Sequence, residues 1–144
     1  MSSASTQWLL SQTSTDAGAW DLPRDPTAPR LARRALVVAL ADLPRDLVQV
    51  AQVLASELVT NALKHGCGRI ALSVVRDDRT LMVRVADEGS QAPVVRQHDV
   101  TSLNGRGLQL IEGLAAAWGT EQVAGENGGK TVWFTLRTTP SQQR

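Results

Sequence analysis

Apolar residues recur along the chain at the three- and four-residue spacing of amphipathic helices. The segments 30–42 and 45–65 carry Ala, Leu and Val at this spacing, and a third helix is expected over 105–117. Pro44 marks the end of the first segment, because a proline cannot continue a helix. Gly66 follows the second segment at a usual position for a helix terminator. The pattern therefore predicts three helices.

Five shorter stretches alternate apolar residues with others, which is the period-two pattern of β-strands. The predicted strands cover 17–22, 70–76, 80–87, 118–124 and 131–136. The turn Asp77-Asp78-Arg79 joins the second strand to the third, and the glycine-rich segment 125–129 joins the last two, so both pairs read as hairpins. Residues 88–104 have no clear period and are expected to form a long loop. This order of elements predicts an α+β sandwich.

Length and composition indicate one soluble domain. The 144 residues are 42% hydrophobic and 20% charged, which is ordinary for a globular protein. We expect the domain over 17–137, with a flexible tail over 1–16 and a second tail over 138–144. The single cysteine, Cys67, excludes an internal disulfide. The apolar runs fall short of the roughly 20 residues that span a membrane. No secretory signal is recognisable, so we expect a cytoplasmic protein without a membrane partner.

Charge and aromatic content argue against direct binding of nucleic acid. The formal net charge is +1, and the chain has one phenylalanine and no tyrosine. A nucleic-acid-binding surface needs clustered basic residues and stacking aromatic rings. The basic residues here are spread along the chain, so this class of function is not favoured.

The helix expected over 45–65 changes character along one face. At 100° per residue, its apolar stripe contains Leu47, Val50, Ala51, Leu54 and Leu58. Continued toward the C-terminus, the stripe meets Asn61 and His65, with Glu57 on its edge. Burying such groups without partners costs about 1–3 kcal/mol each. A helix cap or a bond to the backbone would account for one of them, but three on one face favour a binding site.

Two other features interrupt an apolar series. Alternate residues of the strand expected over 80–87 are apolar until Asp87, and Gly89 follows closely. Alone, this is an ordinary aspartate at the end of a strand. Farther on, Gly105-Arg106-Gly107-Leu108 opens the third predicted helix and suggests a phosphate cradle, where free N–H groups and the helix dipole face an anion. A third glycine is missing for a dinucleotide fingerprint, and no Gly-Lys-Ser/Thr follows for a Walker loop.

In order and spacing, these features resemble the motifs of the ATPase superfamily that includes DNA gyrase, heat-shock chaperone ATPases, histidine kinases and mismatch-repair ATPases. The resemblance covers residues 19–137. The segments that resemble its asparagine box, two glycine boxes and closing strand are Glu57–His65, Asp87–Gly89, Gly105–Leu108 and Gly129–Phe134. The resemblance implies the Bergerat ATP-binding fold, a two-layer sandwich with a mixed, mostly antiparallel sheet covered on one face by about three helices. It also implies ATP and Mg²⁺ as cofactors.

The resemblance further implies a role for each matching residue. Asn61 would ligate Mg²⁺ through its amide oxygen, since a hard cation that keeps several waters needs few protein ligands. Asp87 would accept a hydrogen bond from the adenine amino group. Glu57, as the catalytic residue, would orient or deprotonate a hydroxyl nucleophile beside the γ-phosphate. The implied cofactor-binding set is Asn61, His65, Asp87, Gly89, Gly105, Arg106, Gly107, Leu108 and Thr131.

Within the superfamily, the chain resembles most the short anti-sigma factor kinases of actinobacteria. This implies a serine/threonine protein kinase that phosphorylates an anti-anti-sigma antagonist, holds a sigma factor and forms a homodimer. Two alternatives remain: a regulator that binds its partner without catalysis, and an orphan histidine-kinase catalytic domain. Two positions depart from the family pattern on the adenine side. Gln91 replaces a glycine, and Lys130 takes the place of a threonine, with Thr131 one residue later.

Overall fold

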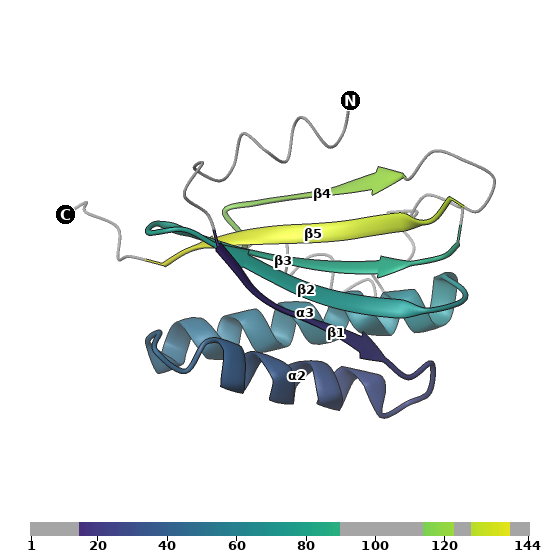
Figure 1. Ribbon diagram of the computed structural model, residues 1–144, viewed down its shortest axis with the longest axis horizontal. Helices are drawn as coiled ribbons and strands as arrows, with labels where there is room; N and C mark the ends of the chain where they lie inside the picture. The colour runs from purple at the N-terminus through teal and green to yellow at the C-terminus, as the bar shows by residue number, and fades with distance from the viewer. Residues whose placement is uncertain (1–14, 90–113, 123–127, 139–144) are drawn as a thin grey trace.

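The computed structural model describes residues 15–89, 114–122 and 128–138. In chain order, its helices and strands are β1 (Thr15–Leu22), α2 (Ala28–Ala39), α3 (Arg45–His65), β2 (Ile70–Arg76), β3 (Thr80–Asp87), β4 (Ala117–Gln122) and β5 (Lys130–Arg137). The two helices lie side by side on one face of a single sheet (Figure 1). The α+β sandwich is thus confirmed for the described residues, while most of the helix predicted over 105–117 lies outside them.

The five strands are ordered β1-β2-β3-β5-β4, and all four pairings are antiparallel. The expected mixed sheet is therefore wrong for the described part of the chain. The connections explain why. The turn after Arg76 reverses the chain directly between β2 and β3. Between β1 and β2 the chain runs along two antiparallel helices, which return it to the sheet end where β1 finished, so β2 must run back against β1.

The core fills the space between the helices and the sheet. In α2, Ala28, Ala32 and Leu36 are fully buried at a spacing of four residues, which is one face of a helix. The sheet contributes alternate residues from its central strands, as the period of two requires. Those with no more than 4% of their surface exposed include Leu72, Val74, Leu81, Val83, Val85, Phe134 and Leu136. No helix in the described ranges is long and apolar enough to cross a membrane.

The bounds of α3, β2 and β3 agree with those predicted from the sequence. The helix expected over 30–42 instead covers Ala28–Ala39. It begins earlier because Pro29 fits in its first turn. The N–H groups of the first turn have no acceptor within the helix, so a proline there costs no hydrogen bond, and its fixed φ suits a helix. It ends earlier because Leu40 already has a non-helical backbone, at φ −114° and ψ 27°. The helix predicted to end at residue 117 was three residues too long, since Leu114 is the last helical residue and Ala117 already begins β4.

Candidate functional site

The C-terminal end of α3 lies against the end of β3. The Glu88 backbone N–H donates to the carbonyl oxygen of Cys67 at 2.8 Å and joins the two segments. Gly66 ends α3 with φ −102°, which any residue adopts, so a left-handed backbone is not why a glycine is present. A Cβ at this position would collide with the Asp87 carboxylate. The glycine therefore permits the close approach of α3 to Asp87.

Asp87 takes part in a buried ion pair with Lys130. The two residues face each other as the last pair of the β3–β5 register. The Lys130 Nζ lies 3.2 Å from Asp87 Oδ2 and 3.3 Å from Oδ1, and the two side chains are 4% and 3% exposed. The Gly89 backbone N–H also donates to Oδ1, at 2.7 Å. Both carboxylate oxygens are thus engaged by donors of the chain itself.

Glu57 and Asn61 lie one helical turn apart on the last half of α3, and both are half-buried. Neither side chain makes a hydrogen bond or an ion pair with any residue that the structure describes. Burial raises the pKa of the Glu57 carboxyl above its usual value, because the charged form loses hydration. The helix thus presents an acid and an amide whose polar atoms are not engaged by the part of the chain that the structure describes.

The buried face of α3 differs from the predicted stripe near its C-terminal end. This helix packs on both α2 and the sheet, so its buried face is broad, and its last three buried residues are Leu58, Val59 and Ala62. Asn61 and Glu57 consequently lie on the edge of this face rather than at its centre. His65, expected to point inward, is exposed as the last residue of α3.

The structure gathers some of the sequence-predicted residues and separates others. Gly89 is buried and lies against Gly66 and Asp87. Thr131 pairs with Ala86 and therefore occupies the opposite face of the sheet from Asp87. Gln91 and the second glycine motif fall outside the described residues, and the residues of that motif are Gly105, Arg106, Gly107 and Leu108.

Sequence reasoning missed Arg24, which holds the C-terminal end of α3 in place. Its guanidinium donates to three backbone carbonyls: Gly68 at 2.8 Å, Leu63 at 3.2 Å and Ala62 at 3.0 Å. A cation suits this position, because the last carbonyls of a helix have no partners and carry partial negative charge. Arg24 lies in a loop without helical or strand periodicity, so no pattern singled it out.

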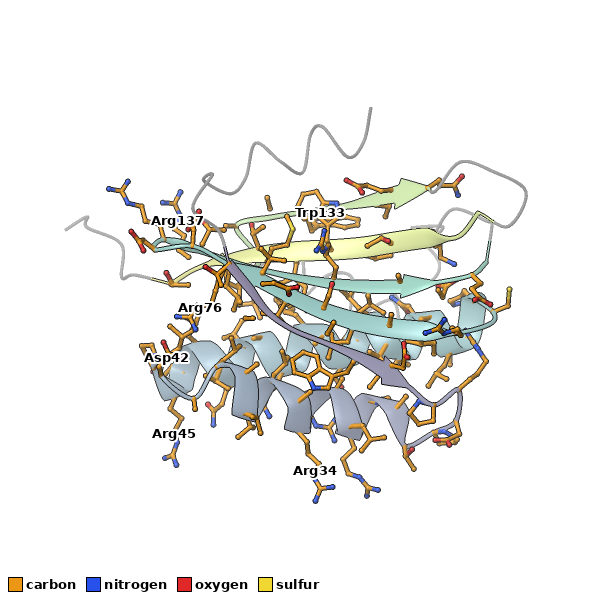
Figure 2. The ribbon with its side chains drawn as sticks, viewed as in Figure 1. Arg34, Asp42, Arg45, Arg76, Trp133 and Arg137 are labelled. Carbon is orange, nitrogen blue, oxygen red and sulfur yellow. The ribbon has the colours of Figure 1, made fainter. Side chains whose placement is uncertain are left out.

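Arg24→Ala is expected to lower the free energy of unfolding by about 1 kcal/mol, since two bonds to the last turn of α3 and one to Gly68 are lost at a largely exposed position. Denaturant unfolding measures this change. Arg34→Ala is the matched control, because Arg34 projects from α2 into solvent (Figure 2). If both variants unfold at the same denaturant concentration, Arg24 does not anchor α3.

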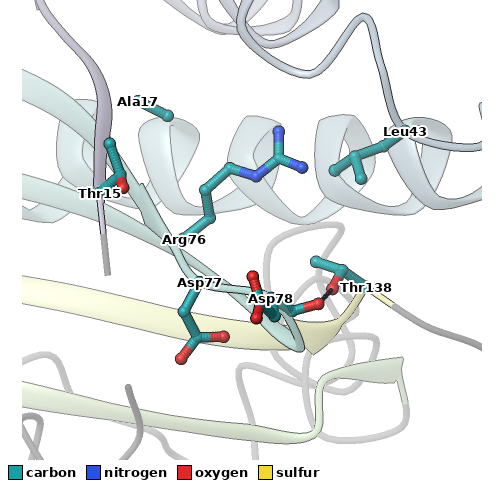
Figure 3. Close-up of a pocket in the computed structure, with 7 residues that line it drawn as sticks. All are labelled: Thr15, Ala17, Leu43, Arg76, Asp77, Asp78 and Thr138. Carbon is teal, nitrogen blue, oxygen red and sulfur yellow. Dashed lines mark hydrogen bonds between the residues drawn. The ribbon is translucent and has the colours of Figure 1, made fainter. Parts of the chain in front are cut away.

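A cavity of about 510 Å³ lies at the other end of the sheet (Figure 3). Its wall includes the Asp77-Asp78 turn and Arg76, and the Arg76 guanidinium is already paired with both oxygens of Asp42 at 2.8 and 2.9 Å. Asp87 is the last of the eight residues of β3, which begins directly after this turn, so the two lie roughly 25 Å apart. The cavity is therefore a separate feature from the group at the end of α3.

A comparison with protein families assigns most of the chain to one family. The family model described as the histidine kinase-like ATPase domain matches residues 22–136, from the end of β1 to the last residues of β5. The comparison with curated proteins found no match.

Proposed function

Because the chain belongs to the histidine kinase-like ATPase domain family, we propose that this ATP-binding domain is a serine/threonine protein kinase that also acts as an anti-sigma factor. The observation that carries the catalytic part of the proposal is Glu57. It is a half-buried carboxylate with a raised pKa and no cationic partner in the described residues, one helical turn before Asn61.

The residues on the α3 side fit a nucleotide bound with Mg²⁺. The Asn61 amide oxygen is a hard oxygen ligand of the type that Mg²⁺ prefers, and no described residue uses it. Bound ATP would supply the phosphoryl group, and the metal would neutralise charge on the phosphates. At the end of the site that would hold the adenine ring, the Asp87 carboxylate would accept a hydrogen bond from the adenine amino group, although Lys130 forms an ion pair with the same carboxylate.

Glu57 favours a hydroxyl as the acceptor of the phosphoryl group. A serine or threonine hydroxyl must give up its proton during attack, whereas a neutral imidazole already carries a free lone pair. A base is therefore of more use to a hydroxyl nucleophile. The raised pKa of Glu57 improves its match to this task, because a stronger base accepts the proton more readily. This difference between the two nucleophiles favours a serine/threonine kinase over an orphan histidine-kinase catalytic domain.

The proposed partners are a sigma factor and an anti-anti-sigma antagonist, and the proposed assembly is a homodimer. The support is the resemblance of the chain to the short anti-sigma kinases in its compactness and in the length of the segment between its two glycine motifs. In this scheme the antagonist carries the serine or threonine that Glu57 activates. The sigma factor is held when the antagonist is not engaged.

Incubating the protein with radiolabelled ATP, Mg²⁺ and candidate antagonist proteins tests the proposal. We expect label on a serine or threonine of one antagonist, identified by peptide mapping. If a sigma factor is held but no antagonist is labelled, the kinase proposal is wrong and a regulator that only binds its partner takes its place. The ion pair between Lys130 and Asp87 favours that alternative, because it obstructs the carboxylate that adenine would need.

A further inference from the structure

We propose that Lys130 determines how strongly the site binds the purine base, because its ammonium group occupies the carboxylate that the 6-amino group of adenine would need. This inference rests on the proposed nucleotide site and concerns a lysine that stands where the family pattern has a threonine. It follows from three properties of the Asp87–Lys130 pair: its geometry, its enclosure and its charge.

The geometry leaves little of the carboxylate for a ligand. Lys130 Nζ lies almost equally far from the two oxygens, at 3.2 Å from Oδ2 and 3.3 Å from Oδ1. Oδ1 also accepts the Gly89 backbone N–H at 2.7 Å. A carboxylate keeps about four acceptor positions, and those that point into free space are the ones a base could use. Lys130 covers both oxygens from one side.

The backbone around the Asp87 carboxylate covers its remaining sides. A Cβ at Gly66 would overlap the Asp87 carboxylate, and one at Gly89 would lie 2.9 Å from Oδ1. The carboxylate is thus walled by two glycine backbones and by the Lys130 ammonium, and the Asp87 side chain is only 3% exposed. An amino group from outside can reach it only if the lysine moves away.

Charge makes this movement unfavourable. Lys130 is buried, with 4% of its side chain exposed, and Asp87 is its only ion-pair partner among the described residues. A buried ammonium that leaves its carboxylate must find water or another acceptor. Binding of adenine therefore exchanges one donor on Asp87 for another, and the net gain from the amino group is small. Removing the ammonium should restore that gain.

The first experiment uses the unmodified protein. Its affinity for ATP is compared by calorimetry with its affinity for purine riboside triphosphate, which lacks the 6-amino group, both with Mg²⁺. We expect the two affinities to agree within about threefold, because Lys130 offsets the hydrogen bond of the amino group. A preference for ATP of more than about tenfold in the unmodified protein would overturn the inference.

The second experiment uses Lys130→Met, which keeps the length of the side chain and removes its charge. We expect this variant to bind ATP at least about tenfold more tightly than the unmodified protein and to prefer it over purine riboside triphosphate by a similar factor. Its affinity for Mg²⁺ tripolyphosphate, which has no base, should not change. Arg137→Met is the control, since it removes an exposed positive charge from the far end of the same strand.

The outcomes separate this inference from the proposed function. If ATP and tripolyphosphate bind but Lys130→Met gains nothing, the role of Lys130 is wrong and the nucleotide site stands. If neither ligand binds to the unmodified protein or to the variant, both proposals fail. If the variant does not fold, as judged by circular dichroism, the comparison of the two nucleotides on the unmodified protein decides the question alone.

Discussion

Glu57→Gln is expected to reduce phosphoryl transfer to a protein hydroxyl by about 10²–10⁴-fold, the usual contribution of a positioned general base. Glutamine keeps the size of the side chain and cannot accept the proton. MgATP binding should stay within about 1 kcal/mol of that of the unmodified protein, because the acid acts on the nucleophile and not on the nucleotide. Transfer is measured by labelling of the antagonist, and binding by calorimetry.

The same substitution has a consequence for stability. Burial raises the pKa of Glu57 in the folded protein, so the folded state binds its proton more tightly than the unfolded state does. Stability then falls as the pH rises from the ordinary value of 4.5 through the raised folded pKa, and above this window the charged carboxylate opposes folding. Glutamine removes this effect. Glu57→Gln should therefore melt at a higher temperature than the unmodified protein at pH 8, with a smaller difference at pH 4.

Loss of transfer together with gain of stability distinguishes a functional acid from a structural one. If the carboxylate served only the fold, its substitution would make the protein less stable. The rate of phosphoryl transfer would then fall because part of the protein is unfolded. Asp78→Asn is the matched control, because Asp78 is an exposed acid at the opposite end of the sheet. A Glu57→Gln protein that binds ATP and still labels the antagonist at the normal rate would remove Glu57 from the mechanism.

Local patterns predicted the elements that carry the site. Gly66 gave the C-terminal bound of α3, whereas Pro44, predicted to mark the end of the helix over 30–42, stands directly before α3, five residues after α2 ends at Ala39. Apolar residues at every second position gave β2 and β3, and this period placed Asp87 on the core-facing side of its strand. Even so, the reason for Gly66 was different from the predicted one, since the approach of Asp87 and not the helix end requires a glycine there.

Contacts between segments that lie far apart in the chain could not be predicted from the sequence. The sequence marked Lys130 only as a departure from a motif, and the ion pair with Asp87 depends on the register between β3 and β5, which joins residues 43 positions apart. A shift of one residue would turn Lys130 to the other face and bring Thr131 to Asp87. Arg24 is a similar case, because its acceptors lie 38 to 44 positions away.

Asn61→Ala is expected to remove the part of ATP affinity that depends on Mg²⁺. The unmodified protein should bind ATP at least about tenfold more tightly with Mg²⁺ than with EDTA, and the variant should bind equally under both conditions. The fold should persist, because the Asn61 side chain bonds to no described residue and alanine is the better helix former. Calorimetric titrations with and without the metal measure the effect.

The metal dependence of the unmodified protein decides whether Asn61 is a ligand at all. Gln49→Ala removes an exposed amide from the first half of α3 and should leave both titrations unchanged. Asn61→Asp retains an oxygen ligand and adds charge, so it should keep the metal dependence that alanine loses. If the unmodified protein binds ATP equally well with Mg²⁺ and with EDTA, Asn61 has no metal to hold. Its free amide would then have to serve the nucleotide directly.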